Sequence, residues 1–341
     1  MALSGLQIYK LLPKTNCKEC NFPTCLAFAM KLAAKQAELS SCPYVSDEAK
    51  IQLEAAAAPP IRLVTISSNG NKVSAGNETV LFRHEKTFYH KPGLFVRVRD
   101  DQPLDEVKAL ASQVGEYHVD YVGLDLFLDG MAVQSVSGDP ETFKACVAAV
   151  REGNKGSLVL MSDDPAVLEA GMAAAADTLP LLYAANADNW QDMAALAKKA
   201  GAPLAVRVAQ GATEAAQGAT EADSLDELAQ LTEQIQAAGV QDLVLDPGAR
   251  QFGESLAVMT QIRRLALKSG VRALGFPVIT FPGEGVENKN DEATLAAQQI
   301  AKYAGFTILD QFSQPLAYAL LVLRQNIFTD PQKPIQVQPD L

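Results

Sequence analysis

Residues 157–208 read SLVLMSDDPAVLEAGMAAAADTLPLLYAANADNWQDMAALAKKAGAPLAVRV. Short apolar runs at 157–161, 179–183 and 204–208 alternate in this stretch with segments of helical periodicity at 165–177 and 190–200. Each helical segment is long enough to carry the chain back along a sheet, so that the next strand runs parallel to the one before it. The stretch therefore predicts consecutive β/α units and places the chain in the α/β class.

The same alternation continues on both sides of this stretch. We predict strands at 94–99, 117–122, 157–161, 179–183, 204–208, 242–245, 276–280 and 306–309, and helices at 104–114, 140–152, 165–177, 190–200, 225–238, 252–269, 292–303 and 315–325. Eight units in about 230 residues match the size of a (β/α)8 TIM barrel, which we assign to residues 93–326. A doubly wound open sheet is the alternative, but no glycine-rich dinucleotide loop follows the first strand.

Three further segments flank the predicted barrel. Residues 1–58 form a small α-helical unit, with helices predicted at 26–39 and 47–58. Residues 59–92 are predicted to hold a linker and a β-hairpin around Asn69-Gly70 that caps the barrel. Residues 327–341 are an extended, proline-punctuated segment, which we expect to be a linker towards a domain beyond Leu341.

Four cysteines are concentrated in the N-terminal unit, with the spacing Cys17-x2-Cys20-x4-Cys25-x16-Cys42 and a proline directly after the last one. Thiolates are soft ligands that suit zinc and iron-sulfur clusters. A proline after the final cysteine is typical of ferredoxin-type clusters. We therefore predict that Cys17, Cys20, Cys25 and Cys42 bind metal and hold a low-potential four-iron four-sulfur cluster.

Two alternatives to the cluster remain open. A four-cysteine zinc ribbon usually contains two Cys-x2-Cys pairs, whereas only one is present. Four metal-free thiols are the other alternative, although a segment of this length needs a covalent or metal staple to fold. The fifth cysteine, Cys146, lies on the apolar face of a helical segment, where we expect a packed core thiol.

Two loops at the carboxyl ends of predicted strands are weaker candidate sites. Asp246-Pro247-Gly248 follows the sixth strand and is similar to the Asp-Pro-Gly loop of pterin-binding barrels such as dihydropteroate synthase. Asp246 either contacts a pterin or caps a turn, and we favour the turn. Gly283-Glu284-Gly285 follows the seventh strand and is a weak phosphate-binding signal, more typical of a turn.

The three histidines carry little functional signal. His84 and His90 are six residues apart and could bind a metal, but no third ligand is evident near them in the sequence. His118 begins the second predicted strand. We expect ordinary structural or interface roles for all three. None has the serine or cysteine context of a nucleophilic triad, so we predict no catalytic residue.

Composition and charge exclude several classes of function. A formal net charge of -11 and an aromatic share of 6% are unlike those of a nucleic-acid-binding protein. No apolar run has the length of a membrane span, and the N-terminus lacks the pattern of a signal peptide. One tight group of cysteines with an odd total is unlike a secreted disulfide framework. We therefore expect a cytoplasmic protein without a nucleic-acid or membrane partner.

Several motifs together resemble the large (gamma) subunit of the corrinoid iron-sulfur protein of the acetyl-CoA pathway and of the acetyl-CoA decarbonylase/synthase complex. The resemblance extends over essentially the whole chain. Its motifs are Gly5-Leu6-Gln7-Ile8-Tyr9-Lys10, Asn16-Cys17-x2-Cys20, Pro23-Thr24-Cys25-Leu26-Ala27-Phe28-Ala29-Met30, Cys42-Pro43-Tyr44, the stretch 78–90, Leu245-Asp246-Pro247-Gly248 and Arg324-Gln325-Asn326.

The resemblance implies a methyl-group carrier, a component of a methyltransferase system rather than a stand-alone catalyst. Its cluster donates an electron that returns cobalt(II) to cobalt(I) during methyl transfer from a methyltetrahydropterin to acetyl-CoA synthase. The implied partners are the small (delta) subunit, methyltetrahydrofolate methyltransferase, acetyl-CoA synthase/CO dehydrogenase and a reductive activator. The corrinoid (cobalamin) belongs to a C-terminal domain that would begin where this chain stops, so we do not expect these residues alone to hold it.

Two rival functions remain. The first is a pterin-dependent methyltransferase barrel with an accessory cluster, for which Asp246 would be a pterin ligand. The second is an electron-transfer docking module in which the barrel serves only as a scaffold.

Overall fold

The computed structural model describes residues 5–33, 36–46, 49–50, 53, 59–82, 85, 88, 90–208 and 221–329. The chain divides into a small unit, Met1–Pro60 with Lys268–Gly270, and a large unit, Ile61–Leu267 with Val271–Leu341. The finer limits predicted at residues 58, 92 and 326 stay predictions. None of the helices in these described ranges is both long and apolar enough to cross a membrane.

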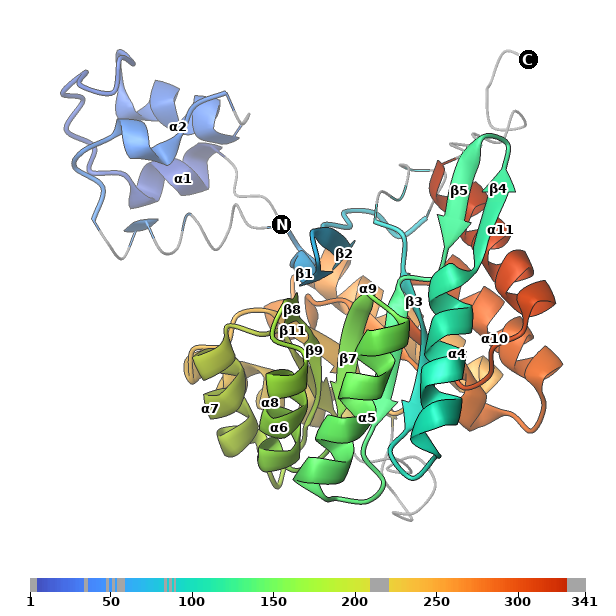
Figure 1. The fold of residues 1–341 in the computed structure, drawn as a ribbon. Coiled ribbons are helices and arrows are strands. Elements are labelled where there is room, and N and C mark those ends of the chain that lie inside the picture. The colour runs from blue at the N-terminus through green and yellow to red at the C-terminus, as the bar shows by residue number, and fades with distance from the viewer. Residues whose placement is uncertain are drawn as a thin grey trace, which may run out of the picture. The chain divides into compact units, whose positions relative to one another are not determined.

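Eight parallel strands close into a barrel in the large unit (Figure 1). They are β3 (Gly93–Arg99), β6 (Gly130–Gln134), β7 (Ser157–Met161), β9 (Leu181–Ala185), β10 (Leu204–Arg207), β11 (Leu243–Asp246), β12 (Val278–Thr280) and β13 (Ala304–Leu309). The strands pair in chain order, and β13 closes the ring by pairing with β3. The predicted (β/α)8 barrel is thereby confirmed.

The helices follow the predicted positions closely. They are α4 (Leu104–Glu116), α5 (Pro140–Gly153), α6 (Pro165–Ala174), α7 (Trp190–Ala200), α8 (Glu221–Ala237), α9 (Phe252–Arg264), α10 (Lys289–Ala301) and α11 (Gln314–Thr329). Asp139 and Asp164 cap α5 and α6 by accepting backbone N–H bonds, and each is followed by proline at the first helical position. A π-helical turn, Leu265–Ser269, extends α9.

The strand predicted at 117–122 is not part of the barrel, and this prediction was wrong. The segment forms β4 (His118–Tyr121), which pairs with β5 (Leu124–Phe127) as a hairpin that extends beyond the end of α4 in Figure 1. The second barrel strand is β6, which the sequence analysis missed. Alternating polar and apolar residues are typical of a half-exposed antiparallel strand, whereas parallel barrel strands are buried on both faces.

The fourth strand is displaced relative to its prediction at 179–183. The barrel strand β9 begins at Leu181, whereas β8 (Thr178–Leu179) pairs with β1 outside the barrel. Pro180 lies between the two segments and has no backbone N–H to donate, which marks the division between them.

A β-hairpin closes the amino-terminal end of the barrel. Strands β1 (Val64–Ser68) and β2 (Asn71–Ala75) are joined at Asn69-Gly70, both of which have positive φ, as the Asn-Gly signal predicts. Hairpin side chains including Ile66 and Val73 share one buried cluster with residues from inside the barrel. A Cβ atom on Gly93 would lie 2.8 Å from Cγ1 of Val73, so this close approach requires glycine.

The small unit contains α1 (Gly5–Leu11), α2 (Cys25–Ala33) and a 3-10 turn, Leu39–Ser41. Its core consists of apolar side chains such as Phe28 together with cysteines. The helix predicted at 26–39 is shorter than expected, because residues 36–38 are not helical. The helix predicted at 47–58 lies largely outside the described residues, although residues 49–50 and 53 are helical.

Candidate functional site

The four predicted ligands come from three places in the small unit. Cys17 and Cys20 lie in the loop between α1 and α2, Cys25 is the first residue of α2, and Cys42 follows the 3-10 turn. Cys20, Cys25 and Cys42 are buried in one core, whereas Cys17 is exposed. All four are free thiols rather than disulfides. The structure therefore places three of the thiols away from water and one at the surface.

The loop that carries Cys17 and Cys20 has an unusual backbone. Asn16, Lys18 and Asn21 all have positive φ, a conformation in which turns direct backbone N–H groups into a concavity. Asn16 accepts a hydrogen bond through Oδ1 from the backbone N–H of Cys25 at 2.8 Å, and its own N–H donates to the Cys25 sulfur at 3.4 Å. These bonds hold the loop against the start of α2.

A second bond joins the loop to the segment after Cys42. The Tyr44 hydroxyl donates to Oε1 of Glu19 at 2.8 Å, across 25 residues of sequence. This hydrogen bond to Glu19 raises the pKa of Tyr44, and the charges of Glu19, Cys17 and Cys42 add to the effect. The Tyr44–Glu19 bond thus ties the segment after Cys42 to the loop that carries Cys17 and Cys20.

The chemistry of these side chains fits an iron-sulfur cluster. Four thiols without a histidine or carboxylate among them form a soft donor set. Within the described ranges, no group of three or more His, Cys, Asp and Glu side chains is arranged to hold a metal ion. Zinc and an iron-sulfur cluster both remain compatible with these four thiols.

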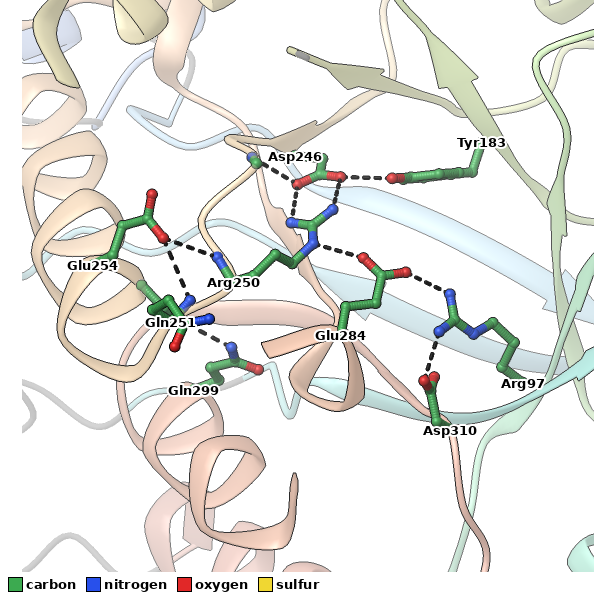
Figure 2. Close-up of polar contacts among 11 residues, drawn as sticks. Arg97, Tyr183, Asp246, Arg250, Gln251, Glu254, Glu284, Gln299 and Asp310 are labelled. Atoms are coloured by element: carbon green, nitrogen blue, oxygen red, sulfur yellow. Dashed lines mark hydrogen bonds and ion pairs between the residues drawn. The ribbon is translucent and has the colours of Figure 1, made fainter. Parts of the chain in front are cut away.

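Ion pairs lie at the mouth of the barrel (Figure 2). Asp246, the last residue of β11, is completely buried. Arg250 donates to both of its carboxylate oxygens at 2.8 Å, and the Tyr183 hydroxyl donates to Oδ2 at 2.6 Å. The backbone N–H of Gly248 also donates to Oδ1, at 2.9 Å. Both carboxylate oxygens of Asp246 therefore have partners within the chain.

The network extends across the mouth from Arg250. Its Nε donates to Glu284 at 2.7 Å, and Glu284 in turn accepts from Arg97 of β3 at 2.5 Å. Arg97 also donates to Asp310, directly after β13, at 2.6 Å. Residues of β11, β3 and the end of β13 are thus joined by an alternating chain of charges, as Figure 2 shows.

Burial and pairing change the ionisation of this network. Burial acts to raise the pKa of Asp246, but the charge and hydrogen bonds of Arg250 outweigh it and the pKa is lowered. Burial and the nearby Asp246 carboxylate raise the pKa of Tyr183 well above its usual value. The carboxylate is therefore ionised and the phenol protonated at neutral pH, which is the state that the hydrogen bonds require.

Sequence reasoning found Asp246 but missed the residues that pair with it. Arg97 interrupts the apolar strand Gly93–Arg99, and Arg250 follows Asp246 by four residues. A charge inside an otherwise apolar strand could have been used to predict a buried partner of opposite charge, because an unpaired buried charge is very costly. Glu284 lies in the 3-10 turn Pro282–Gly285, which confirms the expected turn and presents a carboxylate rather than a phosphate-binding surface.

The other residues considered in the sequence analysis are the three histidines and Cys146. His90 is partly buried beside a cavity of about 30 Å³, and burial lowers its pKa. His118 is exposed and lies 2.9 Å from Asp125. Burial raises the pKa of Cys146 to about 12, so this thiol stays protonated and unreactive. His84 lies outside the described residues.

Comparison with known proteins identifies families and folds that this chain resembles. A family model described as "CO dehydrogenase/acetyl-CoA synthase delta subunit" matches residues 63–341, and one described as "Putative Fe-S cluster" matches residues 12–44. The "7,8-dihydropteroate synthase from Vibrio fischeri" has a similar fold, with a TM-score of 0.50 and 15% identity over 78% of this chain and 99% of that one. Fold and motif together define an eight-stranded barrel protein with an N-terminal iron-sulfur motif.

Two relatives narrow this class. The "Corrinoid/iron-sulfur protein large subunit" of Moorella thermoacetica is 44% identical over 341 residues, which are all of this chain and 73% of the relative. The "Acetyl-CoA decarbonylase/synthase complex subunit gamma" of Methanothermobacter thermautotrophicus is 34% identical over 349 residues, or 99% of this chain and 73% of that protein. The chain belongs to this family of corrinoid iron-sulfur protein large subunits, as the motifs in the sequence indicated.

Proposed function

We propose that this chain is the iron-sulfur subunit of a corrinoid methyl carrier, in which Cys17, Cys20, Cys25 and Cys42 hold a four-iron four-sulfur cluster. The observation that carries the proposal is the set of four free thiols in one small unit, three of them in its core. Membership of the corrinoid iron-sulfur family supports the same assignment. When bound, the cluster supplies the single electron that returns corrinoid cobalt(II) to cobalt(I).

The residues around the thiols have separate roles in this proposal. The fold shields Cys20, Cys25 and Cys42 from water, which limits both oxidation and hydrolysis at those positions. Asn16 fixes the loop against Cys25, and the Tyr44–Glu19 bond fastens the segment after Cys42 to the same loop. These two bonds fix the loop to the start of α2 and to the segment after Cys42.

The barrel acts in this proposal as a scaffold for partners rather than as a catalytic site. We propose that it works with the small (delta) subunit, with methyltetrahydrofolate methyltransferase, with acetyl-CoA synthase/CO dehydrogenase and with a reductive activator. Because ion pairs fill the barrel mouth, we place the corrinoid outside it, in another part of the complete carrier. Methyl transfer would then occur from a methyltetrahydropterin to the corrinoid and on to acetyl-CoA synthase.

The rival pterin-dependent methyltransferase is less compatible with the barrel mouth. A pterin that bound Asp246 would have to displace the guanidinium of Arg250, which makes two bonds to the carboxylate and one to Glu284. Such a bidentate pair is among the strongest polar interactions in proteins. Arg250 therefore occupies the position that a pterin would need.

Iron and sulfide analysis tests the proposed function. Protein purified without oxygen should contain about four iron and four sulfide per chain, and dithionite should produce the electron paramagnetic resonance signal of a reduced cluster. Cys20→Ser should abolish or degrade that signal, whereas the matched control Cys146→Ser should leave it intact. Folded wild-type protein without iron and acid-labile sulfide would refute the proposal.

A further inference from the structure

Arg263, near the end of α9, is a buried arginine whose guanidinium lacks a hydrogen-bonded carboxylate. Its side chain is only 8% exposed, and its Nη1 atom is buried without a hydrogen-bond partner in the described part of the chain. Oε2 of Glu78 lies 3.9 Å from Nη1, which is beyond the range of a hydrogen bond. A buried donor that makes no hydrogen bond is costly, so an acceptor beside Nη1 would stabilise the fold.

The buried arginines of the barrel mouth differ from Arg263 in this respect. Burial acts to lower the pKa of Arg97 and Arg250, but the carboxylates to which they donate outweigh it and both pKa values are raised. Burial also acts to lower the pKa of Arg263, and there the charge of Glu78 opposes the effect without outweighing it. The positive charge of Arg263 is therefore incompletely compensated within the described residues.

Aromatic rings position the guanidinium of Arg263. Its Cζ atom lies 4.5 Å from the ring centre of Tyr303 and 5.9 Å from that of Phe88. The Tyr303 hydroxyl donates to the carbonyl oxygen of Leu81 at 2.7 Å, which fixes the position of that ring. Contact with a ring face offsets part of the cost of burying a cation, but the face is only a weak acceptor for an N–H group. The rings therefore hold Arg263 in place without supplying the missing acceptor.

Arg263 lines a cavity of about 30 Å³ at the amino-terminal end of the barrel, where the first residues of β12 and β13 also line it. About 10–15 Å³ is enough for one particle of water size, so the cavity has room for a small ion. Glu78 and His90 line the same cavity, and burial lowers the pKa of His90, which is therefore neutral at pH 7. Among the lining residues in the described part of the chain, Arg263 is the one that carries a positive charge.

We propose that this cavity binds one small monovalent anion of halide size, with Nη1 of Arg263 as its principal donor. Such an ion supplies both the missing hydrogen-bond acceptor and the missing negative charge. Because the Glu78 carboxylate repels an anion, the ion occupies the side of the guanidinium away from Oε2. The site is separate from the cysteines and from the barrel mouth, so this inference does not depend on the proposed function.

Crystals of the wild-type chain soaked in sodium bromide test the site directly. Anomalous diffraction at the bromine absorption edge should show a bromide ion in contact with Nη1 of Arg263. A cavity that holds only water under these conditions would overturn the inference.

Urea unfolding followed through the fluorescence of Trp190 tests binding in solution. The titrations are run in sodium chloride and in sodium gluconate at equal ionic strength, because gluconate is too large for the cavity. An ion that binds only the folded state lowers the equilibrium constant of unfolding, by about elevenfold when its concentration is ten times its dissociation constant. We expect this chloride-specific decrease in wild type.

Two variants separate binding at Arg263 from the general effect of each salt on stability. Arg263→Met should lose the chloride-specific decrease, whereas the matched control Arg264→Met, which changes the exposed neighbouring arginine of α9, should keep it. Equal chloride effects in wild type and Arg263→Met would refute the assignment of the site. If Arg263→Met does not fold, the bromide measurement on wild type still decides the question.

Discussion

Arg250→Met is the sharpest test of the ion-pair network at the barrel mouth. The substitution keeps an apolar side chain of similar length but leaves Asp246, which is completely buried, without its cation. The carboxylate would retain the Tyr183 hydroxyl and the Gly248 N–H as partners, and Glu284 would lose one of its two arginines. Removing one partner of a buried ion pair costs about 3–5 kcal/mol, and we expect a loss of that size in the free energy of unfolding.

The expected loss of unfolding free energy depends on pH, and the direction of this dependence follows from the pKa of Asp246. Pairing with Arg250 lowers the pKa of this carboxyl in the folded state, so the pair stabilises wild type above the ordinary carboxyl pKa and the contribution is lost as pH falls. In the variant, burial without the cation favours the protonated carboxyl instead. The difference in stability between the two proteins should therefore shrink as pH falls from 7 towards the carboxyl range.

Urea unfolding monitored through Trp190, in α7, provides the measurement for the large unit. The matched control is Arg62→Met, because Arg62 pairs with Asp242 at 2.7 Å while both side chains are about half exposed, at 45% and 46%. An exposed pair of this kind contributes about 0–1 kcal/mol. If Arg250→Met and Arg62→Met reduced stability equally, the network would not be stabilising the barrel and our reasoning would fail.

Three further predictions follow from other parts of the structure. In the same urea titration, Gly130→Ala should lower the large unit's unfolding free energy by about 3 kcal/mol or more, because its Cβ would lie 1.8 Å from the Ser157 carbonyl oxygen. The control is Gly253→Ala, whose Cβ meets nothing within 4 Å. This variant should be neutral or stabilising, by up to about 1 kcal/mol. Tyr44→Phe removes the hydroxyl bond to Glu19 and should speed iron loss to a chelator severalfold, and an unchanged rate would show that this bond does not secure the cysteine loop. Because burial raises the pKa of Cys146 to about 12, iodoacetamide at pH 8 should alkylate it only after unfolding, which peptide mass spectrometry would check.

The sequence by itself determined the barrel, the hairpin signal and the cysteine set. Periodicity predicted seven of the eight barrel strands, with small shifts in their ends, because buried parallel strands and amphipathic helices leave patterns that are local in the chain. Asn69-Gly70 predicted the hairpin turn, since both residues tolerate positive φ. The cysteine spacing indicated a soft metal site, because ligand type and spacing are local as well. Whether these thiols bind a cluster stays a prediction.

Only the tertiary structure decided which strands close the barrel and what fills its mouth. Residues 117–122 have a good strand pattern, but pairing with β5 rather than burial between two barrel strands determines where they lie. Likewise, the sequence left Asp246 between a turn, which we favoured, and a pterin contact, and only the tertiary structure showed the network that it forms with Arg250, Tyr183 and Glu284. Pairing between residues far apart in the chain depends on three-dimensional proximity, which no local pattern of residues encodes.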